Sequence, residues 1–143
     1  MQSAINEQIN FEMFSANTYL SMSAYFAQQG LDGFAHWYYM QYKEELAHAE
    51  DMMHYVITRG GKVEIKAVAA VETEFNSPLE IAEKAYHHEC LVSEKIENLV
   101  RIASEEKDMP SQDFFWKYIR EQVEEEANAT TLIDRIRLSE GHS

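Results

Sequence analysis

The stretch FAHWYYMQYKEELAHAEDMMHY, residues 34–55, decides the fold. Alternating steps of four and three residues along it place mainly apolar and aromatic side chains on one face, which is typical of a helix buried along one side. Two ionisable residues, Glu45 and His48, interrupt this face. Because they are three residues apart, their side chains share one helix surface. The face consists of Phe34, Tyr38, Gln41, Glu45, His48, Met52 and Tyr55.

Glycines and prolines divide the chain into four such segments. Gly30 is expected to end the first helix, and Asp32 to cap the second. Ser77 and Glu80 form a capping box around Pro78 at the start of the third. The expected helices cover residues 3–29, 32–59, 78–107 and 111–138, with an extended connection over 62–76.

The connections predict the topology. Short links make the first and second helices antiparallel neighbours, and likewise the third and fourth. The middle connection of about 16 residues can reach roughly 50 Å, whereas a 27-residue helix is about 40 Å long. We therefore predict one all-α domain over residues 1–143. Its fold is a four-helix bundle, up-down-down-up, with one long crossover between helices two and three.

A glutamate interrupts the apolar face of every helix. In each predicted hairpin the first glutamate lies 18 or 19 residues before the turn region, and the second lies 13 or 14 residues after the next helix start. At about 1.5 Å per residue, all four fall within a turn or two of one level. They are Glu12, Glu45, Glu89 and Glu125.

Burying several carboxylates is strongly unfavourable unless positive charge meets them. No lysine or arginine lies on the four faces. Each glutamate alone reads as a surface residue and His48 alone as a core imidazole, but their coincidence at one level indicates a metal site. Carboxylates with one imidazole suit iron or manganese, with zinc as a redox-inert competitor. Tyr19, on the same face as Glu12, is either a redox neighbour or a core aromatic.

Composition narrows the function further. The formal charge is −13, with 12 Lys and Arg against 25 Asp and Glu, which argues against nucleic-acid and anionic-membrane partners. No apolar run approaches the roughly 20 residues of a membrane span, and the opening residues lack a secretory pattern. The single Cys90 makes a reducing cytoplasm the simpler setting.

Four stretches together resemble the non-haem ferritins of bacteria and archaea over nearly the whole chain. They are NEQINFE (6–12), EELAHA (44–49), YHHE (86–89) and WKY through EQVEEE (116–126). The resemblance implies a ferritin-like fold and a ferroxidase centre, which oxidises Fe(II) with O2 or peroxide. It places Glu12, Glu45 and His48 around one iron and Glu45, Glu89 and Glu125 around the other, with Gln122 beside them.

The resemblance implies more than the di-iron centre. Glu44, Glu121 and Glu124 match a third iron site, although from spacing alone they are ordinary exposed charges. The family assembles into a hollow shell of 24 subunits that deposits ferric oxide inside. We expect no haem, because the haem-binding methionine of bacterioferritins aligns with Leu46.

Departures from the family leave alternatives open. Asn128, not histidine, follows Glu125 by three, unlike rubrerythrins and bacterioferritins. Ferritins usually continue into a fifth helix, whereas this sequence stops at Ser143, so a full shell with altered channels and a smaller oligomer both remain. The rival functions are a di-iron peroxidase without storage and a helical interaction bundle with a polar core.

Overall fold

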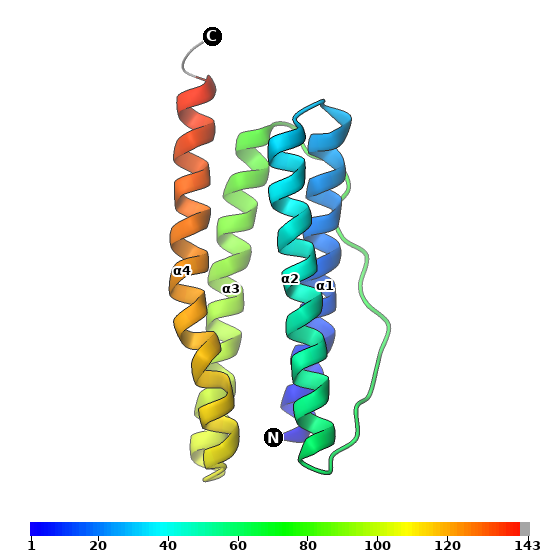
Figure 1. The fold of residues 1–143 in the computed structure, drawn as a ribbon, viewed down its shortest axis with the longest axis vertical. Helices are drawn as coiled ribbons and strands as arrows, with labels where there is room; N and C mark the ends of the chain where they lie inside the picture. Colours follow the sequence, from blue (N-terminus) through cyan, green and yellow to red (C-terminus); the bar gives the residue numbers. More distant parts are fainter. Residues whose placement is uncertain (141–143) are drawn as a thin grey trace. The chain divides into compact units, whose positions relative to one another are not determined.

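The protein is described here by a computed structural model over residues 1–140, which contain four helices in two compact units. One unit holds residues 2–75, and the other holds Asn76 onward together with Met1. The expected domain of residues 1–143 includes residues 141–143, which lie outside the described residues. The helices are α1 (Gln2–Gln28), α2 (Asp32–Thr58), α3 (Pro78–Glu105) and α4 (Met109–Glu140) (Figure 1).

In the first unit a tight turn joins α1 and α2. Gly30 adopts a φ of 74°, a left-handed conformation that glycine takes at little steric cost. Leu31 N donates to the Phe26 carbonyl at 2.9 Å, which closes the end of α1. The expectation that Asp32 caps α2 is wrong. Leu31 is the N-cap, without a side-chain hydrogen bond, because the turn is one residue shorter, and Asp32 already lies in the first helical turn.

The crossover is bound to α1 by two asparagines. Asn6 Nδ2 donates to the Lys62 carbonyl at 2.9 Å, and Asn6 Oδ1 accepts from Glu64 N at 2.8 Å. Asn10 repeats the pattern one turn later, with the Glu64 carbonyl at 3.2 Å and Lys66 N at 3.0 Å. Four helical residues rise about 6.0 Å, and two extended residues span about 6.6 Å. The spacing of the side-chain amides on α1 thus matches the repeat of the extended chain. These amides bond its backbone groups as a neighbouring β-strand would.

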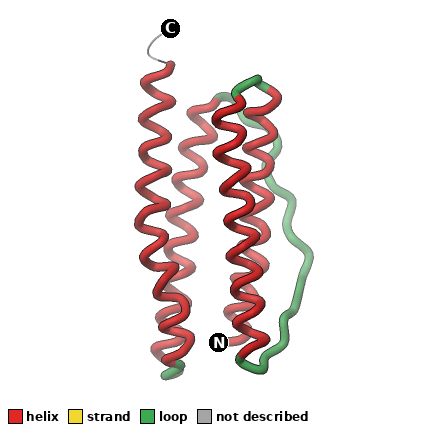
Figure 2. Tube along the Cα trace, in the orientation of Figure 1, coloured by secondary structure: helices red, strands yellow, loops and turns green. Residues whose placement is uncertain are grey.

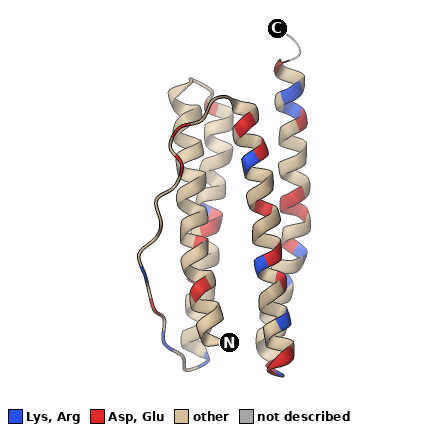
Figure 3. Cartoon of the chain, turned by 180° about the vertical axis from the view of Figure 1, so that it is seen from behind, with Lys and Arg blue, Asp and Glu red and all other residues tan. Residues whose placement is uncertain are grey.

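The crossover follows α1 along most of its length, as Figure 2 shows in green. Near its far end, Ser21 Oγ donates to the Glu72 carbonyl at 2.5 Å. Phe75 then packs edge-on against Tyr25, with ring centroids 5.8 Å apart. Charged residues are spread along the connection (Figure 3). The predicted long extended connection is therefore present, and it runs from the start of α1 to its end.

The second unit is the α3–α4 hairpin. Ser77 Oγ accepts from Glu80 N at 3.2 Å, as the predicted capping box requires. Glu80 itself reaches back to Asn76 N at 2.7 Å, one residue further than in the standard box. These two side chains satisfy backbone amides at the start of α3 and fix where the crossover ends.

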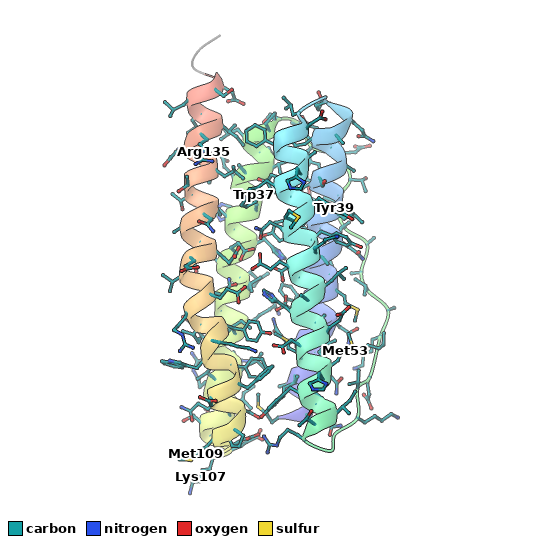
Figure 4. The ribbon with its side chains drawn as sticks, viewed as in Figure 1. Trp37, Tyr39, Met53, Lys107, Met109 and Arg135 are labelled. Carbon is teal, nitrogen blue, oxygen red and sulfur yellow. The ribbon has the colours of Figure 1, made fainter. Side chains whose placement is uncertain are left out.

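The turn from α3 to α4 uses a lysine in place of glycine. Lys107 has a φ of 58°, and Asp108 N donates to the Ala103 carbonyl at 2.8 Å. The Asp108 carboxylate then accepts from Ser111 N at 3.2 Å. Because Asp108 caps the helix, α4 begins at Met109, two residues before the expected start. Lys107 and Met109 both lie at this turn (Figure 4).

The predicted inward faces are confirmed almost residue by residue. On the predicted face of α2 every member is buried except Phe34 and Tyr55, which are half-buried, and the glutamate on each of the four faces is buried. The core of the first unit is aromatic: the Phe26 and Tyr38 rings stack with centroids 5.2 Å apart. No helix within residues 1–140 is long and apolar enough to cross a membrane.

Hydrogen exchange tests the asparagine contacts. The amides of Glu64 and Lys66 lie outside regular secondary structure, yet each has a side-chain acceptor on α1. We expect Asn10→Ala to speed exchange at Lys66 by roughly 5-fold, the equivalent of one lost hydrogen bond, while Glu64 changes less. Asn6→Ala should do the reverse. Equal exchange at both amides in both variants would contradict this pairing.

The left-handed Lys107 offers a stability test. A side chain in this conformation costs about 1 kcal/mol relative to glycine. Lys107→Gly is therefore expected to raise the free energy of unfolding by up to about 1 kcal/mol, measured by urea denaturation. Lys95→Gly, inside α3, serves as the control and should lower it by about 1 kcal/mol. A loss of stability in both variants would show that the turn is not strained.

Candidate metal centre

Three buried ligand-type side chains meet between α1 and α2. Glu12 comes from α1, and Glu45 and His48 come from successive turns of α2. His48 Nδ1 lies 3.4 Å from Glu45 Oε2 and 3.8 Å from Glu12 Oε2. Glu12 is 0% exposed and Glu45 2%. The structure thus brings together three of the predicted ligands within one unit, and one potential ligand atom from each lies within 4.8 Å of the others.

Gln8 supports this cluster and was missed from the sequence. Its Nε2 donates to Glu12 Oε1 at 3.1 Å, and its side chain is buried. The available signal was its position four residues before Glu12, on the same side of α1. By holding one carboxylate oxygen, Gln8 leaves the other, Oε2, facing His48.

The cluster lacks internal compensation for its carboxylates. Glu12 Oε2 and Glu45 Oε2 are buried without a hydrogen-bond partner among residues 1–140. All of the lysines and arginines lie within residues 1–140, and none of them is buried. Unpaired carboxylate oxygens in a dry interior are costly. A bound cation or a proton would therefore stabilise these two carboxylates.

The pKa values of the two carboxyl groups are shifted in opposite directions. Burial raises the pKa of Glu45 well above 4.5, and the negative charge of Glu12 raises it further. Burial alone would also raise the pKa of Glu12, but its interactions with Glu45, His48 and Gln8 outweigh that effect and lower it. Two close carboxylates that cannot both ionise share one proton in this way. A divalent cation would take the place of that proton.

The geometry fits a metal ion. Ligand atoms placed about 2.1 Å from a tetrahedral ion lie about 3.4 Å from one another. The 3.4 Å and 3.8 Å separations around His48 Nδ1 are close to this value. Two carboxylate oxygens and an imidazole nitrogen are ligands that iron, manganese and zinc accept.

The second unit contains a separate polar group on its buried face. Gln122 Nε2 on α4 donates to Glu89 Oε2 on α3 at 3.0 Å and to the Glu89 carbonyl at 3.2 Å. Glu89 is 2% exposed. Glu125 is also buried, one turn beyond Gln122. The predicted ligands Glu89 and Glu125 are thus buried carboxylates of this unit, with Gln122 bound to Glu89.

The other expected site residues differ in exposure. Tyr19 is buried and stacks on Tyr38 with ring centroids 6.2 Å apart. Glu44 and Glu121 are half-buried, and Glu124 is exposed. Burial therefore separates these three from the four glutamates of the inward faces.

The chain is similar to known proteins over nearly its whole length. The family described as "Ferritin-like domain" matches residues 2–139. A bacterial non-heme ferritin of Bacteroides fragilis is 49% identical over 137 residues, covering 96% of this chain and 86% of the relative. A bacterial non-heme ferritin of Campylobacter jejuni is 37% identical over 138 residues, covering 96% and 83%.

Solved structures give the same result for the fold. An open pore ferritin from the archaeon Archaeoglobus fulgidus matches with a TM-score of 0.94 at 45% identity, covering 96% of this chain and 85% of that one. A closed form engineered from the same ferritin also has a TM-score of 0.94 and 45% identity, covering 96% and 84%. The predicted all-α, ferritin-like four-helix fold is confirmed by this likeness.

The raised pKa of Glu45 predicts a pH effect on metal-free protein. Below pH 4.5 both the folded and the unfolded chain hold the proton. As the pH rises above that value, the unfolded chain releases the proton first, so stability falls until the folded pKa is passed. Glu45→Gln removes this loss. We expect the unfolding free energy of Glu45→Gln relative to wild type to increase as the pH rises above 4.5.

Urea denaturation with a chelator present measures this difference. Glu50→Gln, at an exposed position of α2, is the matched control and should give a flat difference. A flat difference for Glu45→Gln as well would mean that Glu45 is not held protonated by burial.

Proposed function

Because the chain belongs to the ferritin family, whose members store iron, we propose that it oxidises Fe(II) and deposits the ferric product as a mineral. One observation carries the proposal: Glu12, Glu45 and His48 meet in a buried position with unpaired carboxylate oxygens. In a helical scaffold, apolar side chains at these positions would be at least as stable.

The proposed iron ligands follow the sequence and the resemblance. Glu12, Glu45 and His48 bind one iron, and Glu45, Glu89 and Glu125 bind the other, with Gln122 beside them. Burial of all four glutamates supports this assignment. Glu44, Glu121 and Glu124 form the proposed third iron site, through which oxidised iron moves toward the store. Tyr19 is proposed as a redox neighbour of the centre.

The residues of the chain have distinct tasks in this reaction. Iron is the substrate: two Fe(II) ions supply two electrons, and O2 takes them with two protons to give hydrogen peroxide, or peroxide itself serves as oxidant. Glu45 exchanges its proton for metal charge. Gln8 keeps Glu12 turned toward His48. The buried apolar faces exclude water, so that only ligand atoms approach the ions.

The assembly and setting are also proposals. We propose that the chain acts as one ferritin-like di-iron domain over residues 1–143, which the family match over residues 2–139 supports. It forms a homo-oligomeric shell, of 24 subunits by family resemblance, in the cytoplasm. No haem, nucleic acid or membrane takes part in this function.

Iron uptake by the purified apoprotein in air tests the storage role. We expect each chain to take up Fe(II) far beyond two ions, with the product remaining soluble in the protein fraction on a sizing column. A di-iron peroxidase would saturate near two ions per chain. A helical scaffold would take up none, and either result would contradict storage.

Ligand variants test the centre itself. We expect Glu45→Ala or His48→Ala to reduce the initial rate of Fe(II) oxidation by at least about 100-fold, because each removes a ligand, while helix content stays constant. Stopped-flow absorbance measures the rate and circular dichroism the fold. Glu50→Ala and His54→Ala, exposed on the same helix, are the matched controls. Undiminished rates in both ligand variants would rule out this site.

A further inference from the structure

A chain of hydrogen bonds leads outward from Glu89 through α4 and back to α3. Gln122 Nε2 donates to Glu89 Oε2 at 3.0 Å and to Ser93 Oγ at 3.2 Å. Ser93 Oγ in turn donates to Glu126 Oε2 at 2.5 Å. Glu126 also accepts from the Cys90 thiol, with Sγ 3.7 Å from Oε1. Glu126 is thus the terminal acceptor of two donors on α3.

The donor-to-acceptor direction of these hydrogen bonds determines which end of the Gln122 amide faces Glu89. A carboxylate only accepts hydrogen bonds, so the Ser93 hydroxyl must give its proton to Glu126. The Ser93 oxygen can then only accept from Gln122, and the amide must turn its nitrogen toward α3. With the amide reversed, its oxygen would face the carboxylate of Glu89, and two acceptors would oppose each other.

Cys90 contacts the same carboxylate. Its thiol donates to Glu126 Oε1, while Ser93 donates to Glu126 Oε2. Both donors on α3 thus point at the same carboxylate.

Water entering from solvent can compete with Ser93 for the hydrogen bonds of the Gln122 amide. Ser93, Gln122 and Glu126 line a small, partly open pocket of about 80 Å³, whose other members include Glu97. A water molecule there can donate to an amide oxygen as easily as it can accept from an amide nitrogen. Two oxygens of Glu89 already favour the observed orientation of the amide. The acceptor at Ser93, whose proton is fixed by Glu126, adds to that preference.

We infer that Ser93 and Glu126 are positioning residues, which act through the amide of Gln122 to hold the Glu89 carboxylate in its metal-binding orientation. This inference rests on the proposed function, because it needs Glu89 to be a metal ligand. The role belongs to charge and hydrogen-bond direction, since neither residue is among the proposed metal ligands.

Co(II) binding to the metal-free protein tests the inference without relying on oxidation. Its visible absorption reports ligand geometry, and a titration gives the affinity. Ser93→Ala and Glu126→Gln are each expected to weaken Co(II) binding by about 10-fold and to change the absorption spectrum. Their combination should lose little more than either alone, because both act through one chain.

Two matched variants separate positioning from other effects. Ser93→Thr keeps the hydroxyl and should bind Co(II) like wild type. Glu97→Gln removes a charge from the same pocket without touching the hydrogen-bond chain, and should also leave binding unchanged. Thermal unfolding of each variant checks that the helices remain equally stable.

The outcomes distinguish this inference from the proposed function. Unchanged affinity and spectrum in Ser93→Ala and Glu126→Gln would overturn the inference alone, provided that wild type binds Co(II). An equal loss in Glu97→Gln would also overturn it, since the general field of the pocket would then be responsible. Failure of wild-type protein to bind Co(II) would overturn the proposed function, and the inference with it.

Discussion

The first unit is built around the mutual repulsion of two buried carboxylates. Glu12 and Glu45 are buried close together, and none of the lysines and arginines is buried with them. Burial opposes their charge, and their proximity allows only one of them to ionise readily. In metal-free protein a proton satisfies this requirement. A divalent cation would satisfy it as well, and it could also bind His48 and the unpaired oxygens.

Such a centre lowers the stability of the metal-free fold, so the rest of the unit must offset it. The aromatic stack of Phe26 and Tyr38 lies on the same faces as the carboxylates, and full burial of both rings contributes stability. The asparagine contacts bind the crossover to α1, which fixes one side of the hairpin that carries Glu12. Metal binding would then add free energy to a structure already held in place by apolar packing.

Residues on the inward faces could be predicted because a helix repeats every 3.6 residues. Glu12, Glu45, His48, Glu89 and Glu125 interrupt otherwise apolar faces, and all five are buried. Helix ends were harder. Whether Leu31 or Asp32 caps α2 depends on the length of the turn, and the Asp108 cap at α4 depends on how Lys107 bends the chain.

Supporting residues escaped sequence analysis for a different reason. Gln8, Ser93 and Glu126 lie beside the inward faces, where polar residues are common and usually solvated. Each role depends on a partner side chain. For Ser93 and Glu126 that partner lies on another helix. Asn6 and Asn10 likewise gain their function from the crossover, more than 50 residues away in sequence. Periodicity within one helix carries no information about pairs formed between separate segments of the chain.

Anomalous diffraction from crystals soaked in Zn(II), a redox-inert substitute for Fe(II), tests the central claim most directly. The account predicts a peak at the zinc absorption edge about 2.1 Å from His48 Nδ1 and from carboxylate oxygens of both Glu12 and Glu45. The ion should replace the shared proton without moving the helices. Zinc bound only at surface carboxylates, with these three side chains unoccupied, would contradict it.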